Sequence, residues 1–171
     1  YQQITFQYSL HVLREPGAAE LEHHEFLYTD QGDPSLALSE HLLERIGEQG
    51  SIIVWNKRFE RGRNEELAAL QPQYAAQFAA INERLYDLME IFSKGLYVDY
   101  RFHGSASIKK VLPVLVPELS YAGLNIGEGA TAMTKWYEMV YGGDAAAGVK
   151  NSLSAEEREQ IAADLLEYCE L

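Results

Sequence analysis

Residues 52–62, Ile-Ile-Val-Trp-Asn-Lys-Arg-Phe-Glu-Arg-Gly, decide the expected fold. The apolar run 52–55 lies between polar neighbours, which is typical of a short strand buried on both faces of a sheet. Asn56 ends this run, and a helical pattern begins near Glu60. A strand that leads directly into a helix places Glu60 at the carboxyl end of the sheet, where ligands bind in open α/β proteins.

A strand pair is predicted ahead of this stretch. Apolar and polar residues alternate over residues 4–10, which indicates a strand with one buried face. Pro16 and Gly17 mark a turn, and residues 24–28 form a second apolar segment of strand type. We therefore expect a hairpin whose strand 4–10 lies antiparallel in one mixed sheet, with strand 52–55 as an inner member.

Helical patterns account for most of the remaining chain. Asp33 and Pro34 combine an N-cap with proline at the first helical position, so a helix begins there. An apolar stripe from Phe78 to Phe92 predicts one continuous helix. Further helices are expected over residues 105–116, over residues 130–141, and after the capping box Ser154-Ala155-Glu156-Glu157.

Composition limits the class of protein. The chain has 171 residues, 47% of them hydrophobic and 23% charged, which predicts a single globular domain over residues 1–171 without a membrane segment. The order of the expected strands and helices predicts an α/β fold. Its one cysteine, Cys169, provides no disulfide framework and favours the cytoplasm. With 14 basic and 26 acidic residues, the net charge of -12 disfavours a protein that grips polyanions by bulk charge. Any nucleic acid would bind at a local site.

Both ends of the sequence interrupt an expected element. Tyr1 stands almost directly before the first strand, and Leu171 falls within a helical pattern. We therefore expect that the chain is part of a longer protein and that the domain is incomplete at both termini.

Several short motifs resemble, in order and spacing, the DEDD superfamily of 3′-to-5′ exonucleases, which has the ribonuclease-H-like fold. Asn56, Phe59 and Glu60 match the second motif, Asn-x-x-Phe/Tyr-Asp, with glutamate in place of aspartate. Residues 87–89 and 107–112 resemble the segments that follow it, and residues 168–171 resemble the start of the third motif, Tyr-x-x-x-Asp. The chain is also similar to a bacterial family of domains of unknown function.

The resemblance implies a fold and a chemistry. The fold would be a ribonuclease-H-like mixed sheet flanked by helices, with its first strand outside this chain. Glu60 and Asp87 would bind Mg²⁺ or Mn²⁺, hard cations that prefer carboxylate oxygens, and two such ions promote phosphodiester hydrolysis. Glu60 and Tyr168 would be catalytic, since the tyrosine of this branch orients the attacking water. The other acids of the family would lie before Tyr1 and after Leu171.

A single-stranded DNA or RNA end is the implied substrate, and other domains of the parent chain are implied partners. The candidate substrate-binding residues are Asn56, Phe59, His103 and Lys109. Each candidate has a simpler alternative, because Asn56 is also a turn former, Glu60 a first-turn acid at a helix N-terminus, and Tyr168 a core residue.

Two other functions are open. A catalytically dead, nuclease-like module for protein interaction or nucleic-acid positioning is favoured by Glu60 in place of aspartate and by the acidic surface. An unrelated α/β hydrolase is disfavoured, because the chain lacks Gly-x-Ser-x-Gly. Two further residues are predicted to be inactive: His23, beside His24, lacks a third metal ligand at suitable spacing, and Cys169 is expected to be buried.

Overall fold

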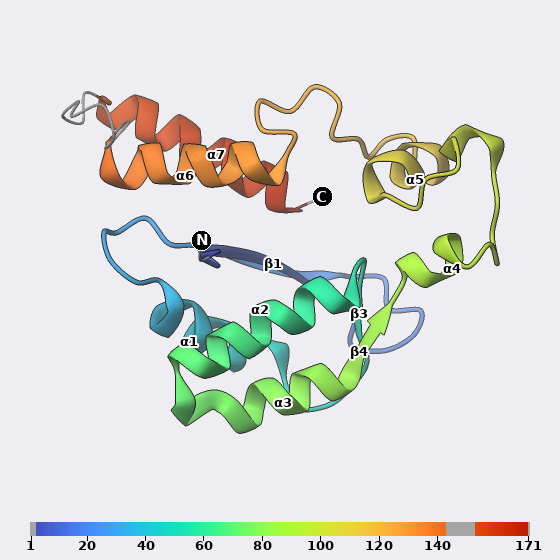
Figure 1. Ribbon diagram of the computed structural model, residues 1–171, viewed down its shortest axis with the longest axis horizontal. Coiled ribbons are helices and arrows are strands. Elements are labelled where there is room, and N and C mark those ends of the chain that lie inside the picture. The colour runs from blue at the N-terminus through green and yellow to red at the C-terminus, as the bar shows by residue number, and fades with distance from the viewer. Residues whose placement is uncertain (1–2, 143–152, 171) are drawn as a thin grey trace. The chain divides into compact units, whose positions relative to one another are not determined.

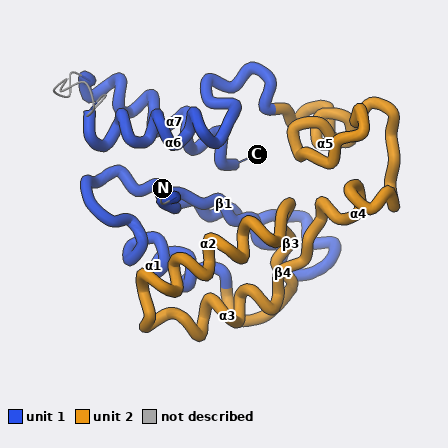
Figure 2. Tube along the Cα trace, in the orientation of Figure 1, with its two compact units in different colours: residues 1–46, 121–171 blue, residues 47–120 orange. Residues whose placement is uncertain are grey.

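The structure, a computed structural model, describes residues 3–142 and 153–170 (Figure 1). The chain divides into two compact units (Figure 2). Unit 1 comprises residues 1–46 and 121–171, and unit 2 comprises residues 47–120. The predicted strand–helix stretch therefore lies in unit 2, while the predicted hairpin and the last helix lie in unit 1.

A β-hairpin opens unit 1, as the alternating pattern predicts. Strand β1, Gln7–Val12, pairs antiparallel with β2, Glu22–Leu27. The amide of Tyr28 also donates a 2.8 Å hydrogen bond to the Phe6 carbonyl, which continues the pairing beyond Gln7. The ladder begins at Gln7 rather than residue 4, and this hydrogen bond extends the pairing by one residue, to Phe6.

Three helices complete the described part of unit 1: α1, Ser35–Ile46, α6, Gly129–Tyr141, and α7, Ala155–Glu170. The start of α1 is as predicted, since Asp33 Oδ1 accepts a 2.8 Å hydrogen bond from the Ser35 amide. The capping box is also confirmed. Ser154 Oγ accepts from the Glu157 amide at 3.2 Å, and Glu157 Oε2 accepts from the Ser154 amide at 2.7 Å.

The core of unit 1 lies where α6 and α7 pack against residues of the hairpin. Trp136 of α6 is 1% exposed and stacks on Phe6, with ring centroids 4.6 Å apart. Its Nε1 donates a 2.6 Å hydrogen bond to the Tyr28 carbonyl. Leu165 of α7 is fully buried in the same cluster, and α7 contacts both strands. These contacts fix the position of the last turns of α7 on the hairpin.

A parallel strand pair organises unit 2. Strand β3, Ile52–Val54, pairs with β4, Leu85–Asp87. The connection runs through α2, Lys57–Leu70, a short 3₁₀ turn, Pro72–Tyr74, and α3, Ala75–Arg84. A tight turn reverses the direction of the chain and can join only antiparallel strands, so parallel strands need a crossover connection of this kind. Helices α2 and α3 lie side by side in Figure 1.

The interface between α2 and α3 is mostly apolar and contains one buried polar pair. Leu67, Phe78 and Ile81 are buried there. Asn64 Nδ2 donates a 2.8 Å hydrogen bond to Asn82 Oδ1, so each buried amide has a partner.

The rest of unit 2 is built from short helices around aromatic contacts. These are α4, Met89–Ser93, the 3₁₀ turn Tyr100–Phe102, and α5, Ile108–Leu115. Trp55 stacks on Phe92 at 5.3 Å between centroids and donates a 3.0 Å hydrogen bond to the Ala106 carbonyl. These contacts connect the segment after β3 with α4 and with the approach to α5.

The predicted single mixed sheet is wrong for the described residues, which form two separate two-stranded ladders, β1–β2 and β3–β4. Ile53 is 57% exposed, so β3 is not buried on both faces. An apolar run indicates a strand but does not specify how many neighbours pair with it. A mixed α/β architecture is confirmed, whereas the ribonuclease-H-like sheet is not.

The continuous helix predicted from Phe78 to Phe92 is also wrong. Helix α3 ends at Arg84, the chain extends through β4, and α4 begins at Met89. Leu85 fits the helical stripe but is buried as a strand residue, so periodicity alone could not separate the two states. In the described part of the chain, no helix combines the length and apolar character needed to cross a membrane.

Candidate functional site

Asn56 fixes the start of α2 directly after β3. Its backbone is extended, and its side-chain oxygen accepts a 3.1 Å hydrogen bond from the Phe59 amide. Its carbonyl accepts another from the Glu60 amide, also at 3.1 Å. Its role as the N-cap of α2 is thus sufficient to explain Asn56 at this position, because asparagine is a preferred N-cap. The cap also determines where Glu60 lies, in the first turn of α2.

Glu60 is a half-buried carboxylic acid without a direct partner. Burial raises its pKa, and the positive charge of Arg63 opposes that shift. Arg63 itself forms an ion pair with Glu66 at 2.7 Å. Across residues 3–142 and 153–170, no hydrogen bond or ion pair reaches the Glu60 carboxylate. The charged form is therefore poorly solvated, and a bound cation would stabilise it.

Asp87, at the end of β4, is engaged by the backbone. Its Oδ2 accepts a 3.0 Å hydrogen bond from the Lys57 amide, and its Oδ1 accepts one of the same length from the Met89 amide. The side chain of Lys57 donates to the Leu85 carbonyl at 2.8 Å. A continuous helix from Phe78 to Phe92 would leave Asp87 solvated, but Asp87 ends strand β4 instead. Each of its oxygens accepts a hydrogen bond from a backbone amide of the local fold.

The site as described does not fit a two-metal centre by itself. Mg²⁺ takes about six oxygen ligands in near-octahedral geometry. Glu60 could provide one carboxylate, but both oxygens of Asp87 accept backbone hydrogen bonds. Within the described ranges, Glu60 and Asp87 do not belong to any group of three potential metal-ligating side chains. The roles of Glu60 and Asp87 as metal ligands stay predictions.

Three candidate substrate-binding residues lie on different elements of unit 2. Phe59 is 50% exposed, and the guanidinium carbon of Arg63 lies 5.3 Å from its ring centroid. His103 is exposed and adopts a left-handed conformation, with φ of 52°, at the end of the 3₁₀ turn. Lys109 is half-buried in the first turn of α5. An exposed aromatic ring suits base stacking, but substrate binding by these residues stays a prediction.

Tyr168 belongs to unit 1, in the last turns of α7. It is half-buried against the core, with its ring edge-on to Tyr121 at 5.7 Å between centroids. Burial raises its pKa, with smaller contributions from Cys169 and Glu128. Core packing is thus sufficient to explain its position. Its convergence with Glu60 of unit 2 on one cleft stays a prediction, and Cys169 is half-buried rather than buried.

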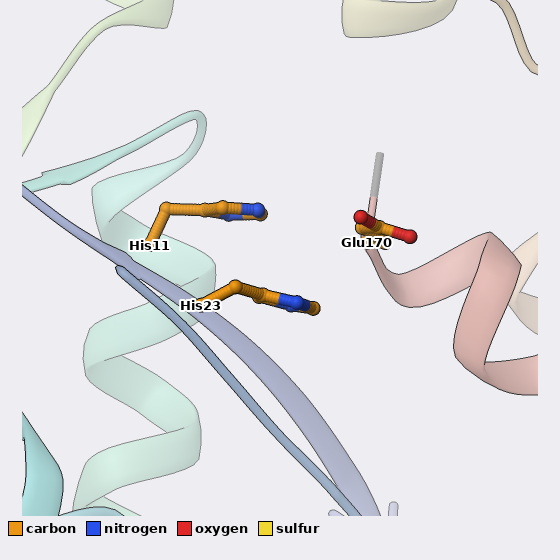
Figure 3. Close-up of side chains that lie close together, drawn as sticks. All are labelled: His11, His23 and Glu170. Atoms are coloured by element: carbon orange, nitrogen blue, oxygen red, sulfur yellow. The ribbon is translucent and has the colours of Figure 1, made fainter. Parts of the chain in front are cut away.

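A further cluster in unit 1 was not predicted from the sequence. His11 of β1 and His23 of β2 are directly paired across the hairpin, and Glu170 ends α7 beside them (Figure 3). Their potential ligand atoms all lie within 4.8 Å of one another. The His23–His24 pair, which lacks a third ligand at suitable sequence spacing, is not the group that forms. The structure instead brings His23 together with two potential ligands distant in sequence, and His24 is not among them. Both histidines lie in the strands of one hairpin, but only the register and the docking of α7 bring the three together.

Comparisons with known proteins place the chain among bacterial proteins without an assigned activity. The family described as "Domain of unknown function (DUF2779)" matches residues 1–107. The chain is 31% identical over 140 residues to the uncharacterized protein UU173 of Ureaplasma parvum serovar 3, and 33% identical over 129 residues to the uncharacterized protein MG366 of Mycoplasma genitalium. These matches cover 72% and 70% of this chain but 19% and 18% of the relatives, so the chain spans about a fifth of their length. No solved structure matches it.

Proposed function

The chain belongs to the DUF2779 family, and we propose that it is the nuclease-like part of a longer cytoplasmic protein that hydrolyses phosphodiester bonds at single-stranded DNA or RNA ends. The observation that supports this proposal is the half-buried Glu60 carboxylate, which has no direct partner and stands at the carboxyl end of a parallel strand pair. The match to a family of unknown function neither favours nor opposes a nuclease.

The location of Glu60 suits a ligand site better than a stabilising contact. The carboxyl ends of β3 and β4 lie at the same edge, because the two strands are parallel, and ligands bind at such edges in α/β proteins. An unpaired, partly desolvated carboxylate destabilises the folded state. Groups with strongly shifted pKa values are enriched at functional sites, because catalytic acids, bases and nucleophiles need pKa values matched to their task. The neighbouring exposed ring of Phe59 adds a surface on which a base could stack.

Glu60 alone cannot hold a catalytic metal, so the proposal requires further carboxylates. Asp87 already accepts hydrogen bonds from two amides, and one further carboxylate would not complete a two-metal site, so we propose that additional ligands come from other segments of the longer protein. The chain on its own is then expected to show no metal-dependent cleavage, because a single carboxylate does not displace enough water from Mg²⁺.

The experiment compares this chain with the natural full-length protein that carries it. Both are incubated with end-labelled single-stranded DNA and RNA, with Mg²⁺, with Mn²⁺ or with EDTA. We expect cleavage by the full-length protein only, loss of it in EDTA, and a loss of at least about 100-fold in Glu60→Gln. Glu65→Gln, an exposed acid of the same helix, is the matched control and should cleave normally.

One result would contradict the proposed placement of the missing ligands, and another would contradict the nuclease activity itself. Cleavage by the isolated chain that Glu60→Gln abolishes would show that the ligands are already complete here. A silent full-length protein would favour the second candidate, a catalytically dead module that binds a protein or positions nucleic acid. That candidate is supported by the structural engagement of Asp87 and by the net charge of -12.

A further inference from the structure

His11 and His23 form a stacked pair of imidazoles on one face of the β1–β2 hairpin. They are direct cross-strand partners, and their rings are stacked with centroids 4.4 Å apart and planes 11° from parallel. Ser9 Oγ lies 2.9 Å from His23 Nε2. Both rings are exposed and point toward the end of α7 (Figure 3). The hairpin therefore presents two nitrogen ligands whose separation is set by the ladder.

Glu170 provides an oxygen at the same place. It lies in the last turn of α7, whose position is fixed by burial of Ile161 and Leu165 against the unit 1 core. The last turn of α7 contains no basic residue, although a helix C-terminus carries partial negative charge. A carboxylate there raises the local negative potential. A cation bound between Glu170 and the hairpin would reduce the repulsion between the Glu170 carboxylate and the partial negative charge of the helix C-terminus.

We propose that His11, His23 and Glu170 bind one divalent first-row transition ion, of which Zn²⁺ is the representative. Two imidazoles and a carboxylate are a ligand set that such ions accept, whereas Mg²⁺ and Ca²⁺ prefer oxygen ligands alone. Ligands of a tetrahedral Zn²⁺ ion lie about 3.4 Å apart, given bond lengths of about 2.1 Å. The three atoms are within 4.8 Å, so rotation of exposed side chains is enough to close the site. Solvent would occupy the remaining coordination position.

This site is separate from the one proposed around Glu60. It lies in unit 1 and uses imidazole nitrogens, while Glu60 lies in unit 2 and would serve a hard cation. The ion would join the hairpin to the C-terminal turn of α7, so metal binding is expected to stabilise unit 1. Failure of either proposal leaves the other unaffected, because their ligand residues and their variants differ.

The test is titration of the metal-free chain with Zn²⁺ by calorimetry and with Co²⁺ by visible absorption. We expect one saturable site, a rise in the melting temperature with Zn²⁺, and no competition from excess Mg²⁺. His11→Ala, His23→Ala and Glu170→Gln should each weaken binding at least about tenfold, the size of loss seen even for groups that only support metal ligands. All three residues are exposed, so the variants should keep the circular dichroism spectrum of the parent in EDTA.

Neighbouring residues provide matched controls. His24→Ala, next to His23 in sequence and half-buried on the opposite face of β2, and Glu167→Gln, earlier in α7, should bind within about twofold of the parent, as expected for surface changes away from a site. Cys169→Ser should also bind normally. Unchanged affinity in the double variant His11→Ala/His23→Ala would overturn the proposal. So would equal losses in the controls, or the absence of saturable binding.

Discussion

The Asp87 side chain at the end of β4 accepts a hydrogen bond of 3.0 Å from the backbone amide of Lys57, the first residue of α2. Its second oxygen accepts one from the Met89 amide, at the start of α4. One carboxylate therefore connects β4 with the N-termini of two helices. Both amides lack intrahelical acceptors, and negative charge is favourable at a helix N-terminus.

Replacement of Asp87 should destabilise the protein even when no metal is present. Asp87→Ala leaves two amides without their charged acceptor, and hydrogen bonds to charged groups contribute about 1.5–3 kcal/mol each. We expect the free energy of unfolding, measured with urea in EDTA, to fall by about 3 kcal/mol. Asp87→Asn retains one acceptor and should lose about half as much. Asp30→Ala removes an exposed charge as the control, and an Asp87→Ala value equal to it would contradict a structural role.

Removal of the Glu60 charge should stabilise the protein in a pH-dependent way. Burial raises the pKa of Glu60 above its usual 4.5, so the folded state favours the protonated acid. As pH rises from 4.5 through the raised pKa, the wild type loses stability by releasing this proton, and Glu60→Gln does not. Urea unfolding at several pH values should show that the free energy of unfolding of Glu60→Gln, relative to that of the wild type, increases across this pH range.

The matched variant for Glu60 is Glu65→Gln, which removes an exposed charge from the same helix. If the difference in the free energy of unfolding between the wild type and Glu60→Gln does not change as pH rises, the ionised Glu60 carboxylate is stabilised in the folded state. It would then have a structural partner, and its assignment as a functional residue would lose its main support.

Trp136 should be among the most sensitive core positions of unit 1. Trp136→Ala removes the stack on Phe6 and the hydrogen bond to the Tyr28 carbonyl, and such truncations cost about 3–5 kcal/mol. Trp136→Phe keeps an aromatic ring but leaves that carbonyl unpaired, so about 1–3 kcal/mol should be lost. Urea unfolding followed by circular dichroism measures both. Equal losses in the two variants would show that ring stacking contributes little.

The capping box of α7 should lose its effect in acid. Hydrogen bonds from the Ser154 amide and hydroxyl group lower the pKa of Glu157 below its usual 4.5. Its contribution to stability is therefore present above pH 4.5 and is lost as pH falls through the lowered pKa. Glu157→Gln should be less stable than the wild type at neutral pH and equal to it in strong acid.

Two variants complete the test of the capping box. Ser154→Ala should cost about 1 kcal/mol, as for other N-caps. Glu159→Gln, beyond the first turn of α7, is the control for charge removal. A difference between Glu157→Gln and the wild type that persists unchanged in acid would contradict the assignment to the capping box.

The sequence by itself determined the local structures, because their causes are local. The alternation over residues 4–10 predicted the hairpin, Asp33 and Pro34 predicted the start of α1, and Ser154 with Glu157 predicted the start of α7. Asn56 was interpreted either as a substrate-binding residue or as a turn former at the strand end, and the structure shows that it caps α2. At each of these helix starts a side chain accepts a hydrogen bond from a backbone amide two or three positions away, so the neighbouring residues in the sequence contain the information.

Only the tertiary structure decided which strands pair and which side chains meet. Leu85 continues a helical stripe, but pairing with β3 makes it a strand residue. An apolar segment indicates that side chains are buried but does not specify which strand pairs with it. The prediction that β3 lies inside one mixed sheet with the hairpin was therefore wrong. The potential ligands near His23 in sequence, His24 and the acids around it, do not belong to the group in which the ligand atoms meet. The register opposite His11 and the docking of α7 on the hairpin bring Glu170 to it, and both depend on packing between segments far apart in the chain.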